Sequence, residues 1–453
     1  QKITKKGEMC MNNKKTADIT VIGFALFSMF FGAGNLLFPP YLGLISGKHW
    51  VISFLGFILA DVGLSLLVMA AAAKCHGNLD KVLGRGGKKL ARLIGAAAIL
   101  CIGPLLAIPR TAATTFEMGV QPVTGLSGAI PTVISSVIFF GLTLVLTIKP
   151  SKVVDIVGKF LTPALLICLA ALIIIGIINP IGNVSETALI NENLFAQGVS
   201  QGYLTMDALG AAALSTVVIA SINDKGYTKD SDKIKITLQS GLLAGIALAL
   251  VYGGLCYLGS TLSTTYGVDT PQASLMVVIT NSLLGYPGKV MLGLIVSLAC
   301  LTTSIGLTSA AAKYFSDISN NKIKYETIVI VSCIFSCVVS NLGVSNIIKF
   351  SSPILEIVYP ALIGLVIMSL LGKYIKYDGS FKGLAYVTLF ISVVSVGSKL
   401  LSLTQVSDML AKLPFASHGF NWIVPAIVGA VIGGLISVLL GSKKGIDLGE
   451  KEA

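Results

Sequence analysis

Twelve apolar stretches, separated by polar segments, constrain this chain more than any other feature of its sequence. Each is long enough to cross bilayer hydrocarbon as a helix, which takes about 20 residues. Charged residues make up 12% of the chain, against roughly 25% in a soluble domain. Backbone groups in hydrocarbon must pair within their own segment, and the alternating pattern of a membrane β-barrel is absent, so we predict an all-α polytopic membrane protein. The predicted spans are 18–46, 51–73, 91–116, 130–148, 155–178, 196–221, 234–260, 288–315, 325–341, 346–372, 381–403 and 421–441.

The basic residues alternate along the chain in step with these stretches. Lys and Arg gather in both tails and in the segments after the second, fourth, sixth, eighth and tenth spans. Because cytoplasmic loops of membrane proteins are enriched in Lys and Arg, this pattern predicts that both termini are cytoplasmic. The net charge of +12 is therefore interpreted as a topology signal and an attraction to anionic lipid, and not as a nucleic-acid-binding surface.

The first predicted span is interrupted near its middle by Gly32-Ala33-Gly34-Asn35, with two prolines following at 39–40. A glycine inside a helix costs about 1 kcal/mol relative to alanine. Unpaired backbone at membrane depth is tolerated only where it lines a cavity or binds something. The alternative is a close-packing face, for which the usual pattern is GxxxG and not GxG. The pattern favours an unwound segment.

The sixth predicted span carries a similar interruption at 201–210 (QGYLTMDALG). It lies five spans after the first, so it enters the membrane from the opposite side. Interruptions in corresponding positions are typical of transporters built from inverted repeats. The predicted organisation is a cytoplasmic tail (1–17), a first repeat of five spans (18–190), a second repeat (191–372), two further spans (373–442) and a cytoplasmic tail (443–453). The polar segment 264–287 is expected to be a loop carrying a short helix.

Such interruptions suit a ligand that carries both signs of charge. Freed N–H groups at a helix N-terminus bind a carboxylate, and freed carbonyl oxygens bind a cation. An amino acid offers a carboxylate and an ammonium group together. The candidate substrate-binding residues are Gly32, Ala33, Gly34, Asn35, Gly202, Tyr203, Leu204, Thr205 and Asp207.

The eighth predicted span contains three adjacent hydroxyl residues, Thr302, Thr303 and Ser304. Hydroxyl groups in helices often bond back to their own backbone. Three in a row, in a chain with two interrupted spans, favour an oxygen-lined site for a hard cation such as Na⁺.

Ionisable residues inside the membrane are functional candidates because burying a charge there is costly. Asp207 adjoins the second interruption and would bind the substrate ammonium or orient the unwound backbone. Arg110 is a candidate for an outer gate with Glu117 or Glu356, and a structural ion pair is the alternative. Asp61 is expected either to hydrogen-bond a neighbouring helix or to carry a proton.

Four motifs together resemble the bacterial branched-chain amino acid carrier family: 31–40 (FGAGNLLFPP), 103–111 (GPLLAIPRT), 202–210 (GYLTMDALG) and 340–343 (SNLG). The resemblance covers nearly the whole chain. It implies the leucine-transporter-type fold, with five-plus-five inverted repeats and discontinuous first and sixth helices. It also implies import of leucine, isoleucine and valine with Na⁺ or H⁺ across the bacterial cell membrane.

The resemblance also implies a sodium site. The stretch 299–305 is similar to the eighth-helix segment that binds sodium in this fold, and the segment 32–35 is similar to the break that holds the substrate carboxylate. The implied sodium ligands are Ser28, Phe31, Ala299, Thr302 and Thr303. A second sodium site is not predicted, because Phe30 stands where the fold usually has a small residue.

Three other functions compete with this one. A membrane enzyme would need a clustered nucleophile, base or set of metal ligands at mid-depth, and we do not expect one here. A channel would be expected to show a repeated filter-like segment, which is not visible. A carrier of the same fold for another small amino acid or solute is the main alternative. We expect no organic cofactor, no nucleic acid and no obligate protein partner.

Overall fold

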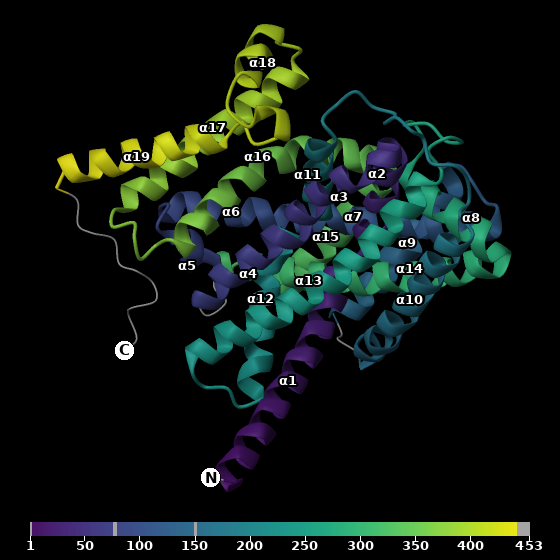
Figure 1. Cartoon of the computed structure of the whole chain (residues 1–453), viewed down its shortest axis with the longest axis horizontal. Helices are drawn as coiled ribbons and strands as arrows, with labels where there is room; N and C mark the ends of the chain where they lie inside the picture. Colours follow the sequence, from purple (N-terminus) through teal and green to yellow (C-terminus); the bar gives the residue numbers. More distant parts are fainter. Residues whose placement is uncertain (1, 76–78, 149–151, 442–453) are drawn as a thin grey trace.

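The computed structural model describes residues 2–75, 79–148 and 152–441, and every regular element within them is a helix (Figure 1). The predicted C-terminal tail, 443–453, lies outside the described residues. The first part of the chain forms α1 (Lys2–Phe30), η1 (Ala33–Leu36), α2 (Phe38–Ser46), η2 (Gly47–His49), α3 (Trp50–Ile58), η3 (Leu59–Gly63), α4 (Leu64–Lys74), α5 (Leu79–Gly84), α6 (Lys88–Leu100), η4 (Cys101–Leu105), α7 (Ala107–Thr114), η5 (Thr115–Val120), α8 (Gln121–Thr124), α9 (Ala129–Ile148) and α10 (Lys152–Ile178). The second part forms α11 (Leu194–Thr205), α12 (Asp207–Asp224), α13 (Asp230–Ser260), α14 (Gln272–Ile318), α15 (Tyr325–Ser340), α16 (Val344–Leu370), α17 (Asp378–Leu400), α18 (Thr404–Ala411), η6 (Ala416–His418) and α19 (Ile423–Leu439).

Seven helical segments of the described chain are long and apolar enough to cross a bilayer. They are Gly34–Lys74, Lys88–Thr124, Ala129–Ile148, Ser231–Ser260, Gln272–Ile318, Val344–Leu370 and Asp378–Leu400. Three shorter apolar helices accompany them: Pro163–Ile178, Tyr325–Ser340 and Ile423–Leu439. The all-α, multi-pass membrane class is therefore confirmed. The count of twelve spans, the repeat and domain boundaries, and the cytoplasmic placement of the termini stay predictions.

Apolar side chains cover the outside of the bundle as well as its core. On α9, Ile130, Val133, Ile134, Val137 and Ile138 are all exposed. They follow one another at helical spacing of three or four residues, so they form one face. An exposed apolar face of this extent indicates contact with lipid.

The helix at the start of the chain stops where the glycines begin. α1 ends at Phe30, Gly32 is extended (φ −101°, ψ 178°), and helical structure resumes as the short η1. α2 then begins with Pro39 and Pro40 in its first turn, where a missing N–H costs no helical hydrogen bond.

A second interruption separates α11 from α12. Met206 has the left-handed conformation (φ 67°, ψ 13°), ends α11 and precedes the first residue of α12. This conformation is uncommon for a residue other than glycine. Here it separates two consecutive helices. The interruption lies inside the segment that the sequence singled out, at one residue.

Two connecting regions differ in detail from the sequence expectation. In the polar segment 264–287, the expected short helix is the first part of α14, which bends at Gly285 (φ 64°, ψ −160°). The segment before α11 folds against η2, where the Lys48 amide donates to the Ser185 carbonyl oxygen and its ammonium pairs with Glu186 at 2.6 Å. Toward the end of the chain, α17 packs closely on α19, and α18 lies beside them at one edge of the bundle (Figure 1).

Candidate functional site

The two interruptions meet at a hydrogen bond between Asn35 and Asp207. The amide Nδ2 of Asn35, on η1, donates to Asp207 Oδ2 at 2.7 Å and also contacts the hydroxyl of Tyr252 on α13 at 2.5 Å. Asn35 and Tyr252 are buried, at 1% and 0% exposure. Residues 172 positions apart in the sequence are therefore tied together at the point where both helices break.

Asp61 lies beside this bond, on the π-helical segment η3. Its Oδ1 accepts a hydrogen bond from the Thr205 hydroxyl at 2.6 Å, one residue before the second break. The carboxyl groups of Asp61 and Asp207 lie within hydrogen-bonding reach of each other. Asp61 Oδ2 is buried and has no donor among the described residues. The sequence left two roles open for Asp61. The hydrogen bond to a neighbouring helix is present, and the role as a proton carrier stays a prediction.

Arg110 completes the cluster from α7. Its guanidinium donates to the carbonyl oxygen of Leu204 at 2.5 Å, near the end of α11. Carbonyl groups in the last turn of a helix lack a helical partner, and the guanidinium supplies one. It also lies against Gly34, where an added Cβ would stand 2.5 Å from Nη2, and 5.4 Å from the centre of the Phe38 ring. A buried positive charge, with 5% exposure, therefore sits between the two breaks.

Gly202 is not the residue at which the sixth span breaks. It lies inside the regular α11, and an added Cβ would approach the Ala60 Cβ to 2.7 Å and the Asp61 amide nitrogen to 3.2 Å. Its neighbour Gly198 similarly faces the backbone of Ser53. Small residues allow helices to approach closely in membranes. Gly202 therefore holds α11 against α3 and η3, and the helix is interrupted four residues later.

The sodium ligands implied by the resemblance come from two helices. Ser28 lies near the end of α1, and Phe31 is the first residue after that helix. The ring of Phe31 stacks on the ring of Tyr252, with the ring centres 6.0 Å apart. Ala299, Thr302 and Thr303 lie on α14, which packs against η1 and α2. The Thr302 hydroxyl donates to the Ala299 carbonyl oxygen at 3.0 Å, as hydroxyls often do within a helix. The sodium site stays a prediction.

The expected gate pairing is not formed in this structure. Glu117 accepts from the Val344 amide at 2.8 Å, at the start of α16, where free N–H groups favour a negative charge. Glu356 instead pairs with Lys399 at 3.0 Å. Within the described part of the chain, neither carboxylate forms a salt bridge with Arg110, because its guanidinium is turned inward to Leu204.

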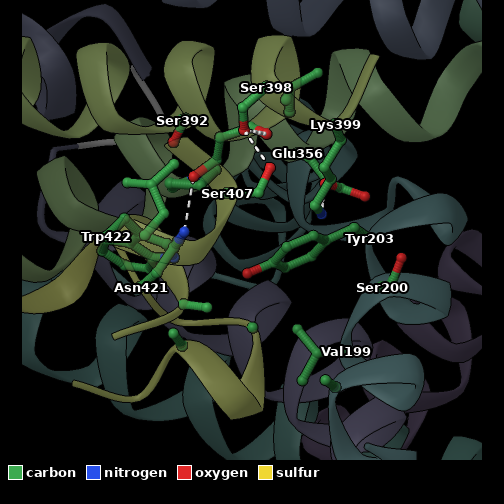
Figure 2. Close-up of a pocket in the computed structure, with 18 of the residues that line it drawn as sticks. Val199, Ser200, Tyr203, Glu356, Ser392, Ser398, Lys399, Ser407, Asn421 and Trp422 are labelled. Carbon is green, nitrogen blue, oxygen red and sulfur yellow. Dashed lines mark hydrogen bonds and ion pairs between the residues drawn. The ribbon is translucent and has the colours of Figure 1, made fainter. Parts of the chain in front are cut away.

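A cavity of about 340 Å³ lies next to the cluster, between α11, α16, α17 and the segment from α18 to α19. Figure 2 shows the Tyr203 ring in this cavity, with Glu356 and Lys399 beside it. Tyr203 stacks on Tyr359 with ring centres 4.4 Å apart, and Tyr359 interacts electrostatically with Asp207. The two stacked rings therefore lie between the cavity and the polar cluster.

Two residues of this region were not anticipated from the sequence. Tyr252 and Tyr359 are fully buried and contact the cluster or its neighbours. Each lies within a long apolar helix with no local interruption. The one available signal was a hydroxyl-bearing aromatic side chain deep within an apolar span, which needs a hydrogen-bond partner when buried.

Comparison with known proteins shows similarity along almost the whole chain. The family model described as branched-chain amino acid transport protein matches residues 15–440. The branched-chain amino acid transport system 2 carrier protein of Pseudomonas aeruginosa is 35% identical over 96% of this chain and 99% of its own length. A branched-chain amino acid permease of Bacillus subtilis is 33% identical over 94% of this chain and 99% of its length.

Solved structures are similar in fold. Mhp1, a nucleobase-cation-symport-1 family transporter in a closed conformation, has a TM-score of 0.60 at 13% identity and covers 93% of this chain and 92% of its own. MhsT in complex with L-phenylalanine has a TM-score of 0.56 at 19% identity, with 92% and 98% covered. Likeness at this identity shows the fold, which is the leucine-transporter type. The relatives matched by sequence are named carriers and permeases, so the chain is a transport protein and not an enzyme. It belongs to the branched-chain amino acid transport protein family.

Proposed function

We propose that this protein imports leucine, isoleucine and valine by alternating access, in symport with Na⁺ or H⁺. The observation that carries the proposal is the meeting of both helix interruptions at Asn35 and Asp207, with the charge of Arg110 between them. A buried site with both signs of charge suits a zwitterion. The family and the names of its members supply the branched-chain class of substrate.

The substrate carboxylate is assigned to Arg110 and to the amide groups of the first interruption. Guanidinium groups bind carboxylates with two parallel hydrogen bonds, and Arg110 already lies against Gly34. The substrate ammonium is assigned to Asp207. The rings of Phe31 and Tyr252 offer an apolar wall for an aliphatic side chain.

The 340 Å³ cavity is proposed as the outer vestibule, with the stacked rings of Tyr203 and Tyr359 as the barrier below it. This placement follows the sequence-predicted orientation, in which both termini are cytoplasmic. Glu356 and Lys399 line the same cavity, as a salt bridge at its rim.

Coupling to Na⁺ is proposed through Ser28, Phe31, Ala299, Thr302 and Thr303, whose carbonyl and hydroxyl oxygens are the ligands that a hard cation prefers. Among the similar structures is a Na⁺-coupled sialic acid symporter, with a TM-score of 0.56 at 13% identity. The competing proposal is a carrier of the same fold for another small amino acid or solute, since the similar structures serve chemically different substrates.

Uptake of labelled leucine into proteoliposomes tests both parts. Excess unlabelled isoleucine and valine are expected to compete strongly, and phenylalanine and uracil weakly. Equal competition by all four compounds would favour the competing proposal. An inward Na⁺ gradient and an inward H⁺ gradient are applied separately, with protein-free vesicles as the control. Uptake that ignores both gradients would contradict symport.

A further inference from the structure

Asp61 and Asp207 line one small cavity and share Thr205 as a neighbour, whose hydroxyl donates to Asp61 Oδ1 at 2.6 Å and accepts from the Asp207 amide at 3.4 Å. When ionised, a carboxylate only accepts hydrogen bonds. Asp61 receives one from Thr205 and Asp207 receives one from Asn35, and Asp61 Oδ2 has no donor among the described residues. A proton on either carboxyl group would supply the missing donor.

The space beside the pair has room for little more than a proton or one water molecule. The cavity that both carboxyl groups line measures about 10 Å³, close to the minimum that holds one water. Its other walls are mainly apolar, with Phe30, Ser65 and Leu248 among them. Two ionised carboxylates that line one small cavity repel each other strongly in such surroundings, so they cannot both remain charged.

The charge balance of the cluster also requires one proton. The ionisable groups that act on the pair are Arg110 from α7, Tyr252 from α13 and Tyr359 from α16. The two phenols are neutral and contribute no charge. With Arg110 positive and one proton on the pair, the cluster carries no net charge. Without that proton it carries one uncompensated negative charge inside the membrane, which is costly.

We propose that Asp61 and Asp207 form a proton-binding site, and that the proton they share is a coupling ion of transport. This inference rests on the proposed function. Asp61 belongs to η3, whereas Asp207 opens α12 beyond the second interruption. Removal of the proton makes the two carboxylates repel, so proton occupancy favours the arrangement in which α12 lies against η3. A ligand shifts a conformational equilibrium when it binds one state better than the other.

Leucine-driven proton entry tests the proposal. The purified full-length carrier is placed in vesicles that contain a pH-sensitive dye and equal Na⁺ on both sides, and leucine is added outside. Leucine exchange between loaded vesicles and medium is measured in parallel, since exchange moves no net proton. The wild-type protein is expected to acidify the interior when leucine enters. Asp61→Asn is expected to lose this acidification and to retain exchange, whereas Asp269→Asn, an exposed loop carboxylate outside the site, behaves as wild type.

The outcomes separate the two proposals. Acidification by Asp61→Asn equal to that of the wild type would overturn the proton site. Wild-type leucine entry without any proton movement would also overturn it, and would leave a Na⁺-coupled importer standing. If Asp61→Asn does not fold, Asp61→Ser takes its place, and acidification by that variant equal to that of the wild type would likewise overturn the site. Absence of leucine exchange in the wild type would instead contradict the proposed function itself.

Discussion

Asn35 is expected to set the affinity for leucine, because it holds the two helix interruptions in register. Its replacement by alanine removes the bond to Asp207 at 2.7 Å and the contact with the Tyr252 hydroxyl at 2.5 Å. A hydrogen bond to a charged acceptor contributes about 1.5–3 kcal/mol and a neutral one about 0.5–1.5 kcal/mol, so the loss is about 2–4.5 kcal/mol. Because this loss falls on the binding-competent arrangement, the apparent Kd for leucine is expected to rise roughly 30- to 2,000-fold.

Equilibrium binding of labelled leucine to the detergent-purified protein measures this change. Tyr252→Phe removes only the neutral contact and is expected to weaken binding about 2- to 12-fold. Asn346→Ala is the matched control, since Asn346 is exposed and its amide donates to the carbonyl oxygen of Leu342 in the turn before α16. A folded Asn35→Ala protein that binds leucine within about threefold of the wild type would refute the reasoning, because the loss of both bonds predicts a change of at least about 30-fold.

Three further changes probe the coupling site, the packing and the surface. The double variant Thr302→Ala, Thr303→Ala is expected to raise the Na⁺ concentration for half-maximal uptake while leaving the competition order of amino acids unchanged; unaltered Na⁺ activation would count against that site. Gly202→Ala is expected to destabilise the protein by about 1–3 kcal/mol through overpacking, seen as a lower Tm, whereas Gly306→Ala, whose new Cβ meets nothing within 4 Å, lowers it less or not at all. The ammonium group of Lys48 forms a salt bridge with Glu186 and holds the pKa of that carboxyl group below its usual range. The salt bridge therefore stabilises the protein at pH values above the usual carboxyl pKa, and its contribution is lost as the pH falls through the lowered pKa of Glu186. In the Glu186→Gln variant, Tm is expected to fall less steeply as the pH is lowered than in the wild type. At neutral pH the variant is expected to change Tm little, because the salt bridge is exposed to solvent.

The membrane class was predictable because composition and periodicity are local properties. Apolar stretches of the right length can satisfy their backbone only as helices in lipid. The end of α1 was also signalled locally, since Gly32 and Gly34 lower helix propensity and α1 does end at Phe30. The extended Gly32 and the prolines of α2 lie where the sequence placed the weak point.

The residue at which the sixth span breaks was not predictable from propensity alone. Glycine is the weakest helix former apart from proline, but Gly202 remains helical because α11 packs on the backbone of α3 and η3 there. Met206, a residue with good helix propensity, takes the left-handed conformation instead. Around it, the Asp61, Asn35 and Arg110 side chains bind Thr205, Asp207 and Leu204, respectively. Tertiary contacts from distant segments therefore decide where the helix ends.

The placement of Arg110 changes how the charged residues are understood as a group. Spacing along an ideal helix puts Arg110 and Glu117 on one face, two turns apart. The π-helical segment Thr115–Val120 begins between them and contains Glu117, so the regular register is altered there. Glu117 instead accepts from the Val344 amide at the start of α16, and Arg110 donates to the Leu204 carbonyl oxygen. The positive charge of Arg110, which the sequence placed at an outer gate, therefore lies between the two helix interruptions. There it offers a partner for the substrate carboxylate, and it also balances the single negative charge that the Asp61 and Asp207 pair retains when it holds one proton. Substrate binding and proton binding thus act on the same buried charge balance, which gives a physical reason for each to affect the other.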